Sequence, residues 1–422
     1  MKKRLKSFFS DPIFKQGGVI FTSSIVVNVL NLVFWLYMVR HLAPQDYGVL
    51  NTFVSVLMFF CVPVGILQTV VTRYTSKYMA HKQVDRVQSL LSYFIRIIGI
   101  FLAVVLFVLV IGSHYISAFL QIDEKRLLYA VAAGIIFNSF ATVTLGALAG
   151  LQRFNDVAIN GIISVISKLF FGFVLVALGL KAFGGLLGFV FSVIVGFCLS
   201  LFQLPKGMIK LKAMPNPVIL DKKDIYSYFL PVGLSMLCFF ALTNMDIILV
   251  KHFFPPLEAG FYSVAQMVGK IVLFVPGAVG VVMFPKIVDH HSKNENTKVI
   301  LRKCLWVVGT LCGIATFFSL IFPAFILKVL TGHDQPQAIA LVKFFAVSMS
   351  FFALINIFMI YHLSLRRMRF IYLMSVMTIF QFLGIWLFHS TLTGVLLTLN
   401  LCSAVLFYFG ICFSRGRVYE RS

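Results

Sequence analysis

Charged residues are scarce in this chain. They make up 12% of its 422 residues, whereas hydrophobic residues make up 60%, and the mean hydropathy is +0.97. A soluble globular protein must present a largely polar surface to water, so this composition excludes that class. We therefore expect an integral membrane protein.

Several motifs that carry catalytic chemistry are also missing. The sequence has no Gly-x-x-x-x-Gly-Lys-Ser/Thr phosphate loop, which excludes ATP hydrolysis by that route, and neither a Gly-x-Ser-x-Gly elbow nor a His-Glu-x-x-His motif. Its seven cysteines lie in or beside apolar stretches without the spacing of metal pairs, so we expect free thiols. The cluster Asp289-His290-His291 lies in a hydrophilic segment and is interpreted as a solvated loop. We expect no enzymatic activity, metal or cofactor.

Apolar stretches of roughly 20 residues recur along the chain, and this length crosses a bilayer core of about 30 Å. The twelve predicted spans are Gly17–Met38, Tyr47–Val71, Gln88–Ile111, Leu127–Leu151, Val157–Leu180, Phe183–Leu204, Tyr226–Val250, Gly260–Met283, Leu305–Leu327, Ala338–Tyr361, Phe370–Phe388 and Leu392–Ser414. The first stretch is too long for the core of a cleavable signal peptide, and no small-x-small cleavage pattern follows it. The fold class predicted is an all-α integral membrane protein of about twelve helices.

The net charge of +22 is distributed unevenly across the predicted membrane. Of the 36 Lys and Arg residues, 26 fall on the side of the N-terminus, six on the opposite side and four inside spans. This bias follows the positive-inside rule over all twelve spans, so it predicts a multi-pass protein of the cell (cytoplasmic) membrane with both termini in the cytoplasm. It also explains the basic charge without nucleic acid as a partner.

The sequence contains two matching halves. A polar inner loop, Lys206–Asp224, separates six spans from six, which predicts an N-terminal half 1–212 and a C-terminal half 213–422. The first outer loop of each half carries a base, a histidine, a proline, an acid and a glycine in the same order. These residues are Arg40, His41, Pro44, Asp46 and Gly48 in the first half, and Lys251, His252, Pro256, Glu258 and Gly260 in the second. Six spans per half make the repeat parallel, as in many transporters. A tight outer turn explains each motif locally, but not its recurrence.

The stretch Leu30–Ala80 resembles the polysaccharide flippase family, the Wzx-like exporters in the superfamily of multidrug and toxin extruders and lipid II flippases. The matching residues are Arg40 to Pro44, Asp46 to Gly48, Gly65 and Arg73, with Asn244 to Asp246 and Glu258 to Tyr262 in the second half. The resemblance implies a V-shaped pair of six-helix bundles that moves a polyprenyl-diphosphate-linked oligosaccharide outwards by alternating access. It further implies the bilayer and the polysaccharide polymerase and chain-length machinery as partners. Lipid II flippases usually carry two further spans, which this chain lacks.

Ionisable residues within spans cost at least about 2.5–3.5 kcal/mol at a helix centre, which makes each of them a functional candidate. The candidate substrate-binding cations are Lys168, Lys270, Arg96, Lys343 and Arg73. They would attract a diphosphate, and the membrane potential would assist its outward movement. Arg96 could instead snorkel to the interface, Lys343 lies near a span end, and Arg73 could be an interface anchor.

Lys168 lies near the middle of its span and shares a helical face with Asn160 and Ser164. This polar stripe predicts the wall of a wet cavity, and the alternative is a structural lysine hydrogen-bonded between helices. On the eighth span Lys270 shares a face with Ser263 and Gln266 in the same way.

Asp246 is the one acid inside a span. It could form an ion pair with Lys270 that locks two helices. Alternatively, it could take up a proton, or exchange Lys270 with the substrate during transport.

Other functions are possible on this topology. A cation-coupled multidrug exporter would favour acids in the first half, where the spans contain none. A glycan polymerase or ligase needs a larger outer surface for its catalytic residues than these short outer loops provide. A major-facilitator sugar transporter would carry a basic glycine motif between spans two and three, and a structural scaffold would not need Lys168 at mid-bilayer.

Overall fold

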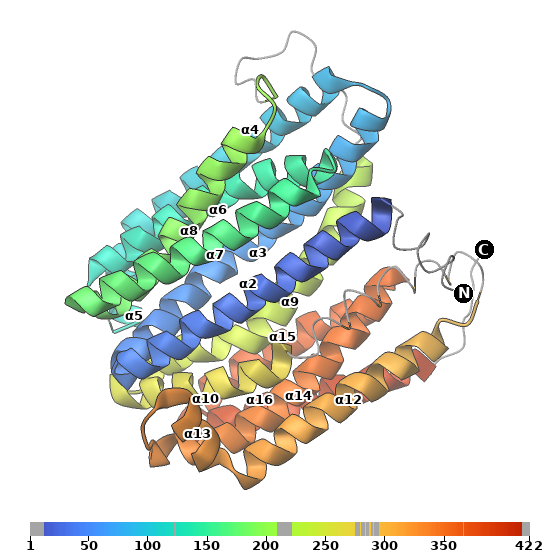
Figure 1. The fold of residues 1–422 in the computed structure, drawn as a ribbon. Coiled ribbons are helices and arrows are strands. Elements are labelled where there is room, and N and C mark those ends of the chain that lie inside the picture. Colours follow the sequence, from blue (N-terminus) through green and yellow to red (C-terminus); the bar gives the residue numbers. More distant parts are fainter. Residues whose placement is uncertain are drawn as a thin grey trace. The chain divides into compact units, whose positions relative to one another are not determined.

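The computed structural model describes residues 12–121, 124–208, 222–274, 279, 283, 287, 290, 295–365 and 367–415. Long α-helices make up most of this part of the chain (Figure 1). The long helices are α2 (Pro12–His41), α3 (Pro44–Ala80), α4 (Val84–Ile111), α6 (Lys125–Gly150), α7 (Phe154–Leu175), α8 (Lys181–Gln203), α9 (Lys222–Phe253), α10 (Pro256–Phe274), α12 (Lys298–Ile321), α14 (Pro336–Ser364), α15 (Arg369–Leu387) and α16 (Leu392–Arg415).

Each predicted span overlaps one of these helices. Ten helical stretches are long and apolar enough to cross a membrane, and one of them, Phe154–Gln203, contains both α7 and α8. The chain reverses there at a π-helical turn, Val176–Leu180, in which Gly179 has a φ of 86° that glycine adopts without strain. α10, a helix of 19 residues, is not among the ten. The prediction of an all-α membrane protein is confirmed.

The described helices form two compact units. The first unit comprises Met1–Leu42 and Val56–Phe229, and the second comprises Ala43–Ser55 and Leu230–Ser422. The predicted division between residues 212 and 213 lies outside the described residues. The N-terminal end of α3, from Pro44 to Ser55, packs with the second unit, although it belongs to the first half of the sequence.

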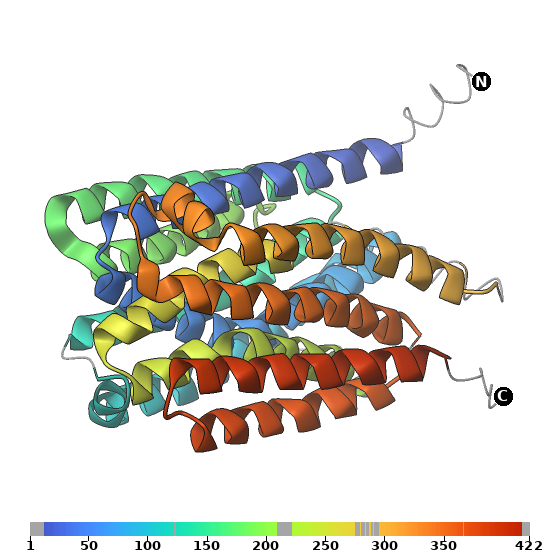
Figure 2. The same cartoon turned by 90° about the horizontal axis from the view of Figure 1, so that it is seen from below.

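The same pattern of helix packing occurs in both units. In the first unit α4 packs on α6, α6 on α8, and α7 on α8. In the second unit the corresponding helices pack in the same pairs, α12 on α14, α14 on α16, and α15 on α16, and the second view shows these helices side by side (Figure 2). The two halves therefore share a packing scheme as well as a motif.

A short helix follows the third span of each half, and the sequence did not predict it. These helices are α5 (Ser113–Phe119) and α13 (Pro323–Thr331). The predicted ninth span, Leu305–Leu327, is wrong at its outer end, because α12 stops at Ile321 and α13 starts at Pro323. Proline lacks the N–H needed to continue a helix but fits its first turn.

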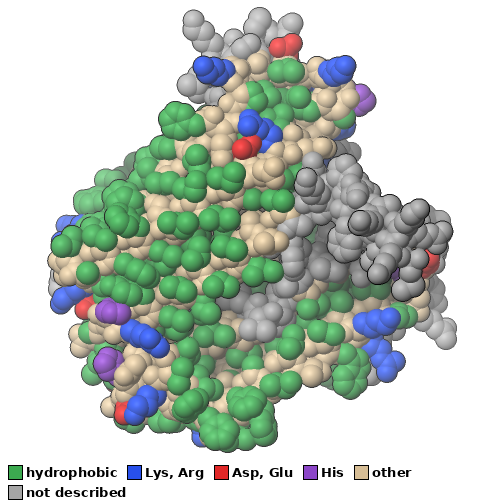
Figure 3. All heavy atoms as spheres, in the orientation of Figure 1, with side chains coloured by type: hydrophobic (Ala, Val, Ile, Leu, Met, Phe, Trp, Pro, Cys, Tyr) green, Lys and Arg blue, Asp and Glu red, His purple; other side chains and the backbone are tan. Residues whose placement is uncertain are grey.

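Hydrophobic side chains cover the middle of the helices, and charged side chains gather towards their ends (Figure 3). On α7 the exposed side chains Ile159, Ile163, Ile166, Phe170 and Val174 recur every three or four residues, which places them on one face. Such an exposed apolar face is what a lipid environment requires.

Candidate functional site

Lys168 is buried within the first unit. Its side chain on α7 is only 4% exposed. The ammonium donates a hydrogen bond to Asn31 Oδ1 on α2. It also lies 4.7 Å from the ring centroid of Phe34 and 4.5 Å from that of Phe189. No carboxylate contacts it among the described residues, so one amide oxygen and two aromatic faces stabilise its charge.

Glycines allow the helices around Lys168 to approach closely. A Cβ atom on Gly172 would lie 2.6 Å from Phe34 Cε2, and one on Gly188 would lie 2.9 Å from Gly172 Cα and from the carbonyl oxygen of Lys168. Small residues at such contacts are typical of membrane helix packing. This packing brings α2 and α8 against α7 and leaves the lysine covered.

The polar stripe predicted on α7 lies at a helix contact in this conformation. Asn160 is 2% exposed and donates a hydrogen bond of 2.8 Å to the carbonyl oxygen of Gly196 on α8. Ser164 donates to Asn160 Oδ1 at 3.3 Å. The stripe therefore joins α7 to its neighbours here, and Lys168 is its one charged member.

Asp246 is the centre of a buried polar network in the second unit. Its side chain on α9 is fully buried. Tyr262 Oη donates to Oδ2 at 2.8 Å, and Gln266 Nε2 lies 3.0 Å from both carboxylate oxygens. Gln266 Oε1 in turn accepts a 2.8 Å hydrogen bond from Asn51, near the N-terminal end of α3. These bonds fix the orientation of the carboxylate and link three helices.

Lys270 lies one turn beyond Gln266 on α10 and is half-buried. Its ammonium interacts electrostatically with the Asp246 carboxylate. The direct partners of the carboxylate in this conformation are Tyr262 and Gln266. Their spacing on α10 is visible in the sequence, but nothing in the sequence indicates that Asn51 of the other half completes the network.

The other candidate cations are more exposed. Arg96 on α4, Lys343 on α14 and Arg73 on α3 are all exposed, and the Arg73 guanidinium lies 5.9 Å from the ring centroid of Tyr74. Of the five predicted cations, only Lys168 is buried. Lys251 of the repeat motif was predicted in an outer loop but is only 2% exposed at the end of α9.

The repeat motif marks the start of equivalent helices. Proline is the first residue, the acid the third and glycine the fifth of both α3 and α10. Asp46 and Glu258 thus lie in the first turn, where a negative charge stabilises the helix dipole. The two glycines meet in space, because a Cβ atom on Gly48 would lie 3.1 Å from Gly260 Cα.

The histidines of the motif also have matching surroundings. His41 stacks on Tyr37 with ring centroids 4.0 Å apart, and Tyr37 stacks on Phe173 of α7. His252 stacks on Trp386 of α15, the helix that corresponds to α7. These ring contacts therefore join corresponding helix pairs in the two halves, α2 with α7 and α9 with α15.

Gly260→Ala is expected to destabilise the protein by about 1–3 kcal/mol, since the added methyl would lie 2.3 Å from the carbonyl oxygen of Pro44. Thermal unfolding of the purified protein would measure the loss. Gly65→Ala is the matched control, because nothing lies within 4 Å of its added methyl, and we expect a neutral or slightly stabilising effect. Equal unfolding temperatures for Gly260→Ala and Gly65→Ala would contradict the close approach of Gly260 to Pro44.

Comparison with known families identifies the chain. A family model described as polysaccharide biosynthesis protein matches residues 13–291. The chain belongs to this family. The match confirms the polysaccharide flippase resemblance predicted from the motifs around Leu30–Ala80.

Two proteins of known source are similar to the chain. It is 21% identical over 260 residues to "Uncharacterized membrane protein MJ1375" of Methanocaldococcus jannaschii, covering 58% of this chain and 60% of that protein. It is 23% identical over 227 residues to "Probable low-salt glycan biosynthesis flippase Agl15" of Haloferax volcanii, covering 50% and 47%. The chain thus matches about half to three fifths of the length of these relatives.

Solved structures share the fold over nearly the whole chain. An inward-facing multidrug resistance MATE family transporter of the MOP superfamily gives a TM-score of 0.71 at 12% identity, covering 92% of this chain and 94% of its own. The lipid II flippase MurJ in an inward closed conformation gives 0.73 at 14% identity, covering 94% and 87%. The predicted MATE-like fold class is therefore confirmed for this family member.

Proposed function

We propose that this protein moves a polyprenyl-diphosphate-linked oligosaccharide from the inner to the outer leaflet of the cell membrane by alternating access. The observation that carries the proposal is the buried ammonium of Lys168, which no described carboxylate contacts. Membership of the polysaccharide biosynthesis family supports a glycan as cargo. The relative from Haloferax, named as a glycan biosynthesis flippase, supports the same reading.

The positive charge of Lys168 favours a cargo with a negatively charged head group. A cation at mid-membrane costs at least about 2.5–3.5 kcal/mol, and a bound anion would offset part of this cost. The same ammonium would repel a cationic drug. A diphosphate head group, with an oxygen-rich and doubly negative surface, is the chemistry that fits.

The aromatic rings around Lys168 allow it to change partners. The faces of Phe34 and Phe189 attract the ammonium more weakly than a diphosphate would. The ammonium can therefore leave Asn31 and the two rings and bind the diphosphate of a cargo that enters the first unit. We propose the remaining cations, Lys270, Arg96, Lys343 and Arg73, as further substrate contacts at other stages of transport.

The membrane potential supplies a driving force for an anionic cargo. Moving one negative charge outwards gains about 2.3 kcal/mol per 100 mV when the inside is negative. A diphosphate that crosses uncompensated gains roughly twice that amount. Asp246 is the proposed coupling group, which takes up a proton or exchanges Lys270 with the cargo, because its carboxylate is fully buried and interacts electrostatically with that lysine.

Cells lacking this protein are expected to accumulate polyprenyl-diphosphate glycans at the inner face of the membrane. Lipid extraction and mass spectrometry would quantify these lipids and identify the glycan by its mass. The wild-type gene should reverse the accumulation, whereas a gene encoding Lys168→Met should not.

Normal lipid levels in these cells, together with a changed sensitivity to cationic dyes, would contradict the proposal and favour a drug exporter. Accumulation of unpolymerised glycan at the outer face would instead indicate a polymerase or ligase. The site of accumulation distinguishes the three functions, because each acts at a different point of glycan assembly.

A further inference from the structure

One side of α12 is exposed along its whole length. Only 17% of its apolar stretch is buried, and no candidate span in the described part of the chain is less buried. From Trp306 to Ile321 its exposed apolar side chains recur in every helical turn and so form one face. They are Trp306, Val307, Leu311, Ile314, Phe317, Phe318, Leu320 and Ile321. We call these residues the α12 stripe.

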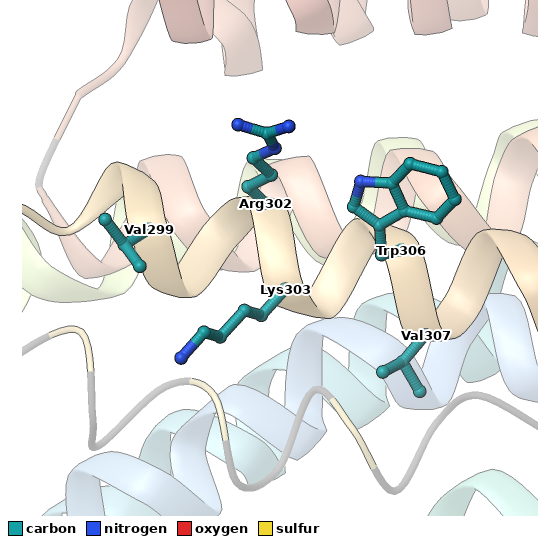
Figure 4. Close-up of a pocket in the computed structure, with 5 residues that line it drawn as sticks. All are labelled: Val299, Arg302, Lys303, Trp306 and Val307. Atoms are coloured by element: carbon teal, nitrogen blue, oxygen red, sulfur yellow. The ribbon is translucent and has the colours of Figure 1, made fainter.

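Two cations lie at the N-terminal end of the α12 stripe. Arg302 and Lys303 are both exposed, and neither has a hydrogen bond or ion pair with any described residue. With Val299, Trp306 and Val307 they line a hollow of about 580 Å³. In Figure 4 Arg302 and Trp306 point upwards from the helix, and Lys303 and Val307 point downwards from it.

This arrangement matches a lipid with an anionic head and a long tail. A guanidinium binds phosphate oxygens through two parallel hydrogen bonds, and an ammonium adds a second positive charge. From Arg302 to Ile321 the helix rises by about 28 Å, close to the full hydrocarbon thickness of a bilayer. The tail of an ordinary phospholipid covers only one leaflet, about half of that length.

We propose that α12 is the docking surface for the lipid part of the cargo. Arg302 and Lys303 bind the diphosphate at the end of α12 that the charge bias places at the cytoplasmic side, and the polyprenyl tail lies along the α12 stripe. The inference rests on the proposed function and adds the position of the lipid before the head group is moved.

Tryptophan fluorescence can test this docking directly, because the chain has three tryptophans and Trp306 lies beside the cations. In a Trp35→Phe, Trp386→Phe background, Trp306 is the one remaining reporter. The full chain in phosphatidylcholine nanodiscs is titrated with undecaprenyl diphosphate, with phosphatidylglycerol and with undecaprenol. We expect a saturable change with the diphosphate, and binding at least about tenfold weaker for the other two lipids.

Arg302→Gln combined with Lys303→Gln should weaken diphosphate binding by about tenfold or more. Both side chains are exposed, so the double variant is expected to fold. Arg369→Gln is the matched control, an exposed cation at the same predicted side of the membrane on α15, and its binding should be unchanged.

Equal binding by the double variant and the control, or equal binding of phosphatidylglycerol and the diphosphate, would overturn the docking proposal. The proposed function is measured separately by lipid export in cells. Normal export in the double variant with unchanged binding would reject only α12 as the site. Absence of glycan-lipid accumulation in cells lacking the protein would reject the function itself.

Discussion

Replacing Lys168 by methionine is expected to lower the export of lipid-linked glycan by at least about tenfold, while the protein still inserts and folds. Methionine keeps most of the length of the side chain and fits between Phe34 and Phe189, but it removes the charge that would meet the diphosphate. Losing one charge-assisted contact of about 1.5–3 kcal/mol corresponds to a factor of ten or more. Quantifying glycan-lipids in complemented cells would measure the effect.

Folding has to be separated from transport in this test. A buried charge replaced by an apolar side chain of similar volume often leaves stability unchanged or increases it, so the methionine variant should unfold at or above the wild-type temperature. Alanine would also leave a cavity and confuse the two effects. Lys328→Met, on an exposed lysine 3.3 Å from Asp334, is the control and should export normally. Full export by Lys168→Met would reject Lys168 as a substrate contact.

Asp246→Asn is expected to abolish export and to lower the free energy of unfolding by about 1–3 kcal/mol. The carboxylate accepts hydrogen bonds from Tyr262 and Gln266 on both oxygens. An asparagine amide offers one oxygen and turns an NH₂ group towards one of these donors. The charge of Lys270 also loses its nearby counter-charge. Thermal unfolding and the cellular export assay would measure the two effects.

A second substitution separates the structural from the coupling role. Adding Lys270→Met to Asp246→Asn removes the uncompensated charge, so part of the lost stability should return. Export should not return if Asp246 is the coupling group. Recovery of export in the double variant would show that the two residues serve only as a structural pair.

The Asp246 network contains residues from both halves of the sequence, because the boundary between the two units lies within α3. Asn51 lies in the N-terminal end of α3, which packs with the second unit, and its amide holds Gln266 in the orientation that donates to Asp246. The close contact of Gly48 and Gly260 fixes the same segment a few residues away. The N-terminal end of α3, from Pro44 to Ser55, thus helps to position Asp246, the proposed coupling group.

Local sequence properties determined the membrane class, the twelve spans and the repeat. Hydropathy over 20 residues reports directly on transfer into lipid, and the bias of Lys and Arg reports on orientation, so neither depends on tertiary contacts. The motif Pro44, Asp46 and Gly48 with its second copy is likewise local, because proline, acid and glycine each favour a particular position in the first helical turns. Lys168 and Asp246 stood out because charges are rare inside apolar helices.

Tertiary structure alone decided what these residues contact. The rotation of a helix about its axis depends on packing against distant segments. The sequence therefore could not predict that Lys168 contacts Asn31 and two phenylalanines, or that Asn160 packs against α8. Nor could the sequence predict the hydrogen bond between Asn51 and Gln266, which are 215 residues apart, or the burial of Lys251. A hydrogen bond between separate helices requires a geometry that all the surrounding contacts set together, and no local pattern encodes it.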